Sequence, residues 1–287
     1  MKKNNIAKAV TLAITGTVLS VGAISSASAS TAMYNTYRLN TEPTTAGTDG
    51  WIWNDGNQKG TTPGASLNPW LGTAGGALPF GYSGSSVLNW AAHVTNAGDS
   101  LTISRDAAVA TYGAGGNVDI DTSKGAWQDT EAVPQGWAHN TDIGLFKSDV
   151  QVNVAITLTS LSTPNAKYGV TLFTGMDTGA NYSHHEGWNS PDNSLPYDTS
   201  NPFFTDNVIY NSHEVNVDST NAFEFTAQAG EIYSIYLGGY QGHNFWNNAK
   251  ERYSLTINTS PVPVPAAVWL FGSGLLGLMS YGRKKAA

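Results

Sequence analysis

A strict alternation of apolar and polar residues in the stretch SDVQVNVAITLTSL, residues 148–161, constrains the fold of this chain more than any other feature. Apolar side chains occupy every second position from Val150 to Leu158, whereas Gln151, Asn153 and Thr157 fall on the positions between them. Successive side chains of a β-strand point to opposite faces of the sheet. The pattern therefore predicts one unusually long strand with a buried face and an exposed face.

Other segments repeat this period of two and predict further strands. Turn residues at Pro164-Asn165 and Ala229-Gly230 each predict a hairpin, the first joining 150–158 to 168–172 and the second joining 223–225 to 233–237. No helical period persists for three turns between the two ends of the chain. We therefore expect an all-β protein, an antiparallel, jelly-roll-like β-sandwich with its function in the loops. The remaining predicted strands are 88–94, 101–103, 118–120 and 253–257.

The N-terminal residues have the pattern of a secretory signal peptide. Lys2 and Lys3 precede an apolar stretch at 6–21, and the small residues Ala27-Ser28-Ala29 match an A-x-A cleavage site. The pattern predicts export by the Sec machinery and a mature chain that begins near Ser30.

The C-terminal residues PVPVPAAVWLFGSGLLGLMSYGRKKAA have three parts in a fixed order. A Pro-x-Pro element at Pro263-Val264-Pro265 precedes an uncharged apolar run at 266–282, and Arg283, Lys284 and Lys285 follow directly. An apolar run of about 17 residues is the shortest that spans the hydrocarbon of a bilayer, and cations after it hold that end in the cytoplasm. We expect a transmembrane helix here.

This order of parts resembles the PEP-CTERM sorting signal of Gram-negative bacteria, although Val264 stands where that family has Glu. The resemblance implies processing by an exosortase, transient residence in the inner membrane, and release or attachment at the cell surface, often beside exopolysaccharide. A permanent single-span anchor is the alternative. The predicted organisation is a signal peptide (1–29), Gly/Thr/Pro-rich loops and edge strands (30–86), a β-sandwich domain (87–260) and the sorting signal (261–287).

Charge and cysteine content exclude some partners. Without the two predicted processed ends, Lys plus Arg falls from 14 to 8 against 21 acidic residues, which gives a body with a net charge of −13. A body this acidic repels phosphate backbones, so nucleic acid is not an expected partner. The chain has no cysteine, which excludes thiolate metal sites. Neither a G-x-S-x-G nor an H-E-x-x-H motif is present, and we do not expect an enzyme.

Histidines in two predicted loops suggest a copper(I) site, one alternative function. His139 precedes the longest predicted strand, and His184 and His185 follow its predicted hairpin partner, so we expect the two loops at one end of the sandwich. Two neutral imidazoles suffice for a linear copper(I) site. The body also resembles the copper(I)-binding, copper-repressible surface proteins of methane-oxidising bacteria, which implies that Trp137 and His139 form their W-x-H element and that His184 or His185 is the second ligand. Loop histidines beside a packing Trp are the structural alternative.

Aromatic residues in polar loops suggest a second alternative, the binding of carbohydrate or exopolysaccharide. Trp188, Tyr240 and Trp246 fall outside strand alternation, and exposed aromatic rings stack on sugars. They could equally cover the ends of the sandwich. The main prediction is an exported cell-surface or extracellular-matrix protein whose β-sandwich is a binding or structural module.

Overall fold

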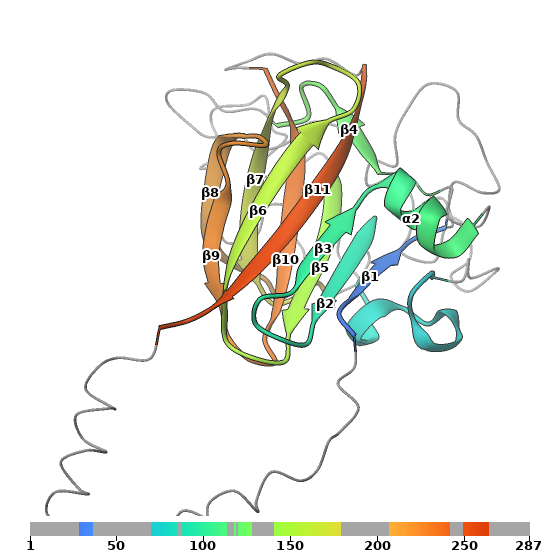
Figure 1. The fold of residues 1–287 in the computed structure, drawn as a ribbon, viewed down its shortest axis with the longest axis vertical. Coiled ribbons are helices and arrows are strands. Elements are labelled where there is room, and N and C mark those ends of the chain that lie inside the picture. Colours follow the sequence, from blue (N-terminus) through green and yellow to red (C-terminus); the bar gives the residue numbers. More distant parts are fainter. Residues whose placement is uncertain are drawn as a thin grey trace, which may run out of the picture.

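The computed structural model of the chain describes residues 29–36, 70–84, 88–113, 118, 120–127, 141–178, 207–241 and 249–263. These residues form two β-sheets packed face to face (Figure 1), which confirms the predicted all-β sandwich. The predicted signal peptide, apart from Ala29, and the predicted transmembrane run lie outside them. Within these ranges no helix is both long and apolar enough to cross a membrane.

The larger sheet has six strands in the order β1-β2-β5-β10-β7-β8. The smaller sheet has the order β3-β11-β6-β9, and β4 pairs with the upper part of β11. The strands of the larger sheet are β1 (Thr31–Tyr34), β2 (Trp90–Val94), β5 (Asp142–Ser148), β7 (Lys167–Thr174), β8 (Ile209–Val217) and β10 (Ile232–Tyr240). Those of the smaller sheet are β3 (Ser100–Ile103), β4 (Asp121–Ser123), β6 (Val152–Ser160), β9 (Phe223–Ala227) and β11 (Lys250–Pro261).

Strand pairing differs from the prediction in two ways. The sheets are not wholly antiparallel, because β2 and β5 pair in parallel, joined by a long connection through β3, α2 and β4. Neither predicted hairpin forms: β6 lies in the smaller sheet and β7 in the larger one, and β9 and β10 are separated in the same way. Each turn takes the chain from the smaller sheet to the larger one. The two strands that it joins therefore face each other across the core and are not hydrogen-bonded neighbours in one sheet.

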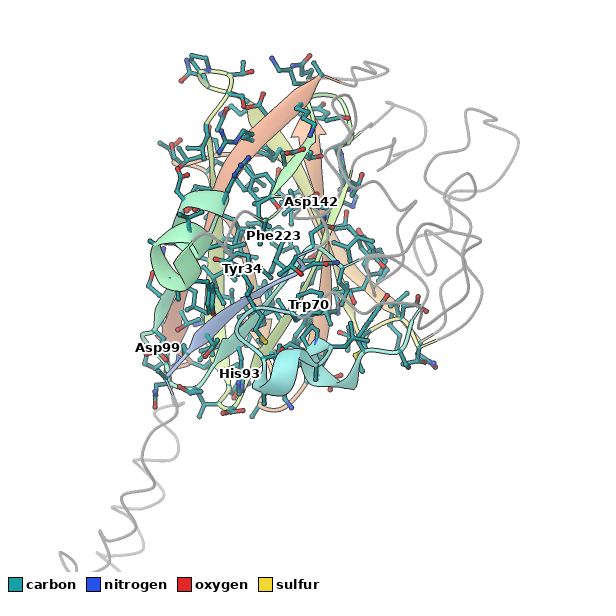
Figure 2. The ribbon with its side chains drawn as sticks, turned by 90° about the vertical axis from the view of Figure 1, so that its right-hand side faces the viewer. Tyr34, Trp70, His93, Asp99, Asp142 and Phe223 are labelled. Atoms are coloured by element: carbon teal, nitrogen blue, oxygen red, sulfur yellow. The ribbon has the colours of Figure 1, made fainter. Side chains whose placement is uncertain are left out.

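The space between the sheets holds the main hydrophobic core. Every second residue of β6 is buried there, from Val152 to Leu158, as the alternation predicts. Trp90 of β2 lies fully buried in the same core, while His93 on the opposite face of β2 is half-buried. Figure 2 shows Tyr34 and Phe223 among the side chains of this interior.

The outer face of the larger sheet is also buried. β5, β7 and β10 are buried at almost every position, which alternation does not predict. A second hydrophobic cluster, the outer cluster, covers this face over β5, β7 and β10, whereas the edge strand β8 is exposed or half-buried along most of its length. The largest members of the outer cluster are Trp70, Tyr82, Leu88, Trp127, Phe173 and Tyr236.

Short helices occupy the connections. The α-helix α2 (Arg105–Tyr112) follows β3, and the 3-10 helices η2 (Ala74–Gly76) and η3 (Pro79–Gly81) lie in the segment before β2. Ser104 caps α2 by accepting a hydrogen bond from the amide of Ala107, and Gly113 ends the helix with a positive φ of 67°. The predicted strand at 118–120 is replaced by β4, which begins at Asp121, although Val118 and Ile120 are buried.

Candidate binding groove

Most of the residues predicted to bind a ligand or to form the sorting signal lie outside the described residues, and two, Tyr240 and Pro263, lie inside them. Tyr240, expected in a polar loop, is the last residue of β10, pairs with Lys167 and packs half-buried against the outer cluster. Pro263 lies two residues after the end of β11. Those outside are Trp137, His139, His184, His185, Trp188, Trp246, Val264, Pro265, Arg283, Lys284 and Lys285.

The strands that flank the predicted copper ligands lie on either side of β10: β5 begins after His139, and β7 ends before His184. Asp142, three residues after His139, pairs with Leu237, and Trp127 forms a bridge with Tyr240. The segment that contains His184 follows β7, whose last residue pairs with Tyr233. Seven residues of strand separate Tyr233 from Tyr240, which is about 23 Å. The predicted hairpin between β6 and β7 is absent, because the two strands lie in different sheets, and the copper site itself stays a prediction.

The two histidines among the described residues, His93 and His213, each contact a neighbouring side chain and do not contact each other. His93 Nε2 lies 2.8 Å from a carboxylate oxygen of Asp149, and His213 Nδ1 lies 2.7 Å from the hydroxyl of Tyr210. Four strand spacings separate β2 from β8 in the larger sheet, which is about 19 Å. Among the residues that the structure describes, no three His, Asp or Glu side chains gather in a way that could hold a metal ion.

Two of the buried carboxylates, those of Asp142 and Glu251, accept hydrogen bonds from neighbouring residues. The hydroxyl of Tyr253 donates to Asp142 Oδ2 at 2.5 Å, and Glu251 Oε1 accepts hydrogen bonds from the Ser160 hydroxyl and from the amide of Thr163 at 3.1 Å. Figure 2 shows Asp142 toward the end of the sandwich opposite to Asp99. Burial, together with the Asp142 carboxylate, raises the pKa of Tyr253 well above its usual value. These groups are buried between the sheets, where a ligand cannot reach them, so we infer that they stabilise the fold.

A groove of about 520 Å³ lies on the smaller sheet. Three consecutive residues from each of three neighbouring strands line it, namely 153–155 of β6, 224–226 of β9 and 258–260 of β11. The central row of these residues, Thr259, Val154 and Phe225, belongs to the inward face of the sheet, so backbone forms the middle of the groove. The outward side chains of the flanking rows form its sides. A groove of this size falls in the usual range for small-ligand sites, about 300–1,000 Å³.

Two asparagine amides in this groove are oriented by neighbouring hydroxyls. The Thr226 hydroxyl donates to Asn153 Oδ1 at 2.9 Å, and the Ser100 hydroxyl donates to Asn258 Oδ1 at 2.8 Å. Because each amide oxygen is engaged within the sheet, each NH₂ group is left to donate to a ligand. The strand alternation of β6 placed Asn153 on the polar face, but the partners from β3, β9 and β11 depend on register between strands far apart in sequence.

The described residues thus define an all-β sandwich of two sheets, and the open face of the smaller sheet carries a hydrogen-bonding groove whose lining includes one exposed carboxylate, that of Glu224. No family model matches the chain, and no curated protein matches it. Among solved structures it is similar to CorA, a surface-associated copper-binding protein important in copper acquisition by Methylomicrobium album BG8. The identity is 10%, the match covers 60% of this chain and 98% of that chain, and the TM-score is 0.28. A likeness this distant says nothing about the site.

Proposed function

We propose that this chain is an exported protein of the cell surface or extracellular matrix, sorted by an exosortase, and that its β-sandwich is a binding or structural module without catalytic activity. One observation carries the proposal: the first and last strands meet the two predicted processing sites at the same end of the sandwich (Figure 1). β1 begins one residue after Ser30, and β11 ends two residues before Pro263.

The turn between β2 and β3 contacts both the first and the last residues of the sandwich domain. The Ser30 hydroxyl donates to a carboxylate oxygen of Asp99, and the Asp99 carbonyl oxygen accepts from the amide of Thr259 at 3.0 Å. The Ser30 bond is the main cause that lowers the pKa of Asp99. Cleavage just before Ser30 and just after Pro261 therefore removes no strand and none of these contacts. A tether at the C-terminal side would hold one end of the module and leave its open sheet face accessible.

Transfer of the tail to another protein tests the sorting proposal. Residues 261–287, fused to an inert exported reporter, should be removed from the reporter in a host with an exosortase, and the reporter should reach the surface. Mass spectrometry of the reporter and cell fractionation measure both. In the same host without its exosortase, the reporter should keep the tail and stay in the inner membrane. A tail kept in both hosts would identify an ordinary anchor.

Copper(I) binding is the second candidate function, and it comes from the sequence pattern Trp137-Ala138-His139 with the pair His184-His185. We expect the full chain, purified with copper(I) under reducing conditions, to hold one copper per chain, and the His139→Ala variant to hold none, because two imidazoles are needed. His93→Ala is the control, since His93 is engaged by Asp149. Copper that survives His139→Ala, or that His93→Ala removes equally, would reject the assigned ligands.

A further inference from the structure

We propose that the groove on the smaller sheet, formed by residues 153–155, 224–226 and 258–260, binds a neutral polysaccharide. This inference names a ligand for the proposed surface module and in that sense depends on the proposed function. The site is separate from the aromatic residues that the sequence suggested for sugar binding, because Tyr240 packs on the larger sheet instead.

The outward side chains of the groove form two rows across three strands. One row is Ser260, Asn153 and Thr226, and the other is Asn258, Ala155 and Glu224, as the pairing of β11, β6 and β9 requires. Ala155 is the smallest side chain in the middle strand, so it leaves room between Asn258 and Glu224. These two residues lie two strand spacings apart, which is about 10 Å. An extended polymer can lie across the strands along the space between the rows.

The hydrogen-bonding groups suit hydroxyls. The oriented amides of Asn153 and Asn258 each offer N–H donors to hydroxyl or ether oxygens, while the exposed Glu224 carboxylate accepts from hydroxyl groups. A sugar hydroxyl both donates and accepts, so it can satisfy both kinds of group. Each amide is held in place before the ligand arrives, which lowers the entropic cost of binding.

The charge and the lining of the groove disfavour anionic, cationic and hydrophobic ligands. The one charged side chain in the groove is Glu224, and the processed body carries a net charge of −13, so an anionic polymer would be repelled. A cation would find one carboxylate where a metal site needs several oxygen ligands. The large apolar residues among those that line the groove, Val154 and Phe225, belong to the inward face of the sheet, so the outward rows offer no anchor for a hydrophobic peptide. A neutral, hydroxyl-rich polymer fits these constraints.

Affinity gel electrophoresis of the full chain in a mild non-ionic detergent tests the proposal. Native gels contain hydroxyethyl cellulose, dextran or galactomannan as neutral polymers, or alginate as an anionic one. We expect retardation by at least one neutral polymer and none by alginate. Loss of either amide, in Asn153→Ala or Asn258→Ala, should weaken binding about tenfold. Ala155→Arg, which fills the space between the rows, should abolish it.

The matched control is Asn211→Ala on the larger sheet. Asn211 is also an exposed strand residue whose amide oxygen accepts from a cross-strand threonine, Thr174, at 2.9 Å. This variant should bind as the unaltered chain does. Retardation by no neutral polymer, equal binding of Ala155→Arg, or equal loss in Asn211→Ala would overturn the proposal. The assay uses purified protein, so it is independent of the sorting experiment, and each proposal can fail alone.

Discussion

The free energy of unfolding is expected to fall steeply above pH 10, by about 4 kcal/mol per pH unit from three buried tyrosines together. Burial raises the pKa of Tyr34 to about 12. Burial also raises the pKa of Tyr168, with a further contribution from the Glu251 carboxylate, and that of Tyr253, beside Asp142. In all three cases the ionised phenolate is disfavoured in the interior.

The protein loses stability as the pH rises because the folded and unfolded states bind different numbers of protons. Below about pH 10 these tyrosines are protonated in both states, and their contribution to stability is fully present. Above that pH the unfolded chain loses the protons while the folded chain keeps them, so the unfolded state is favoured progressively until the pH reaches the folded-state pKa values. Urea unfolding at intervals from pH 8 to pH 11.5 measures the slope.

Single substitutions identify the groups responsible for this slope. Tyr253→Phe should remove about 1.4 kcal/mol per pH unit from it, and Tyr168→Phe should do the same. The two variants should differ at neutral pH: Tyr253→Phe takes a hydrogen bond from the buried Asp142 carboxylate and should cost about 1–3 kcal/mol, whereas Tyr168→Phe takes none from a carboxylate and should cost less. A slope unchanged by both variants would show that other groups control alkaline unfolding.

The second large effect is expected where Trp90 lies against Gly144 in the main core. Trp90 is fully buried, and its partner in the register of β5 is Gly144. A Cβ added at Gly144 would overlap the indole ring. Gly144→Ala should therefore destabilise the protein by about 3 kcal/mol, the upper part of the range for overpacking. Trp90→Ala should cost about 3–5 kcal/mol through the cavity it leaves.

The double variant separates this clash from a general intolerance of alanine at position 144. With Trp90 already replaced by Ala, the added methyl has room, so Gly144→Ala should cost less than about 1 kcal/mol in that background. Gly98→Ala is the control for backbone strain, because Gly98 has a φ of 96° and open space around its Cα. It should cost about 1 kcal/mol. Additive effects of Trp90→Ala and Gly144→Ala in urea unfolding would contradict the described packing.

The all-β fold class could be predicted from the sequence because the residues of one long strand, β6, alternate clearly between apolar and polar. In β6 a period of two sorts the residues into a buried row and a polar row, and the structure confirms both. Pairing could not be predicted in the same way. The turn at Pro164-Asn165 has the composition of a hairpin turn, but composition does not say whether the next strand enters the same sheet or the facing one.

The larger sheet departs from alternation because both of its faces are buried. β8 was not predicted, since its apolar residues do not follow a period of two and its pairing with β7 has two irregularities in register. α2 was missed because it has only eight residues, although Ser104 before it and Gly113 after it are helix-boundary signals.

The candidate groove could be predicted only in part. Alternation places Asn153 on the polar face of its strand, but Glu224 and Asn258 join it through pairings across 69 and more residues of sequence. Strand residues with small polar side chains carry no sequence motif, so nothing in the sequence distinguishes this sheet face as a binding site. The pairing of β11 with both β3 and β6 is what assembles the oriented amides.

The intact mass of the protein recovered from the surface or medium of its own cells tests the central claim most directly. The account predicts a chain that begins near Ser30 and ends close to Pro263, with every described strand retained. A chain of full length that is recovered only from inside the cell would contradict it.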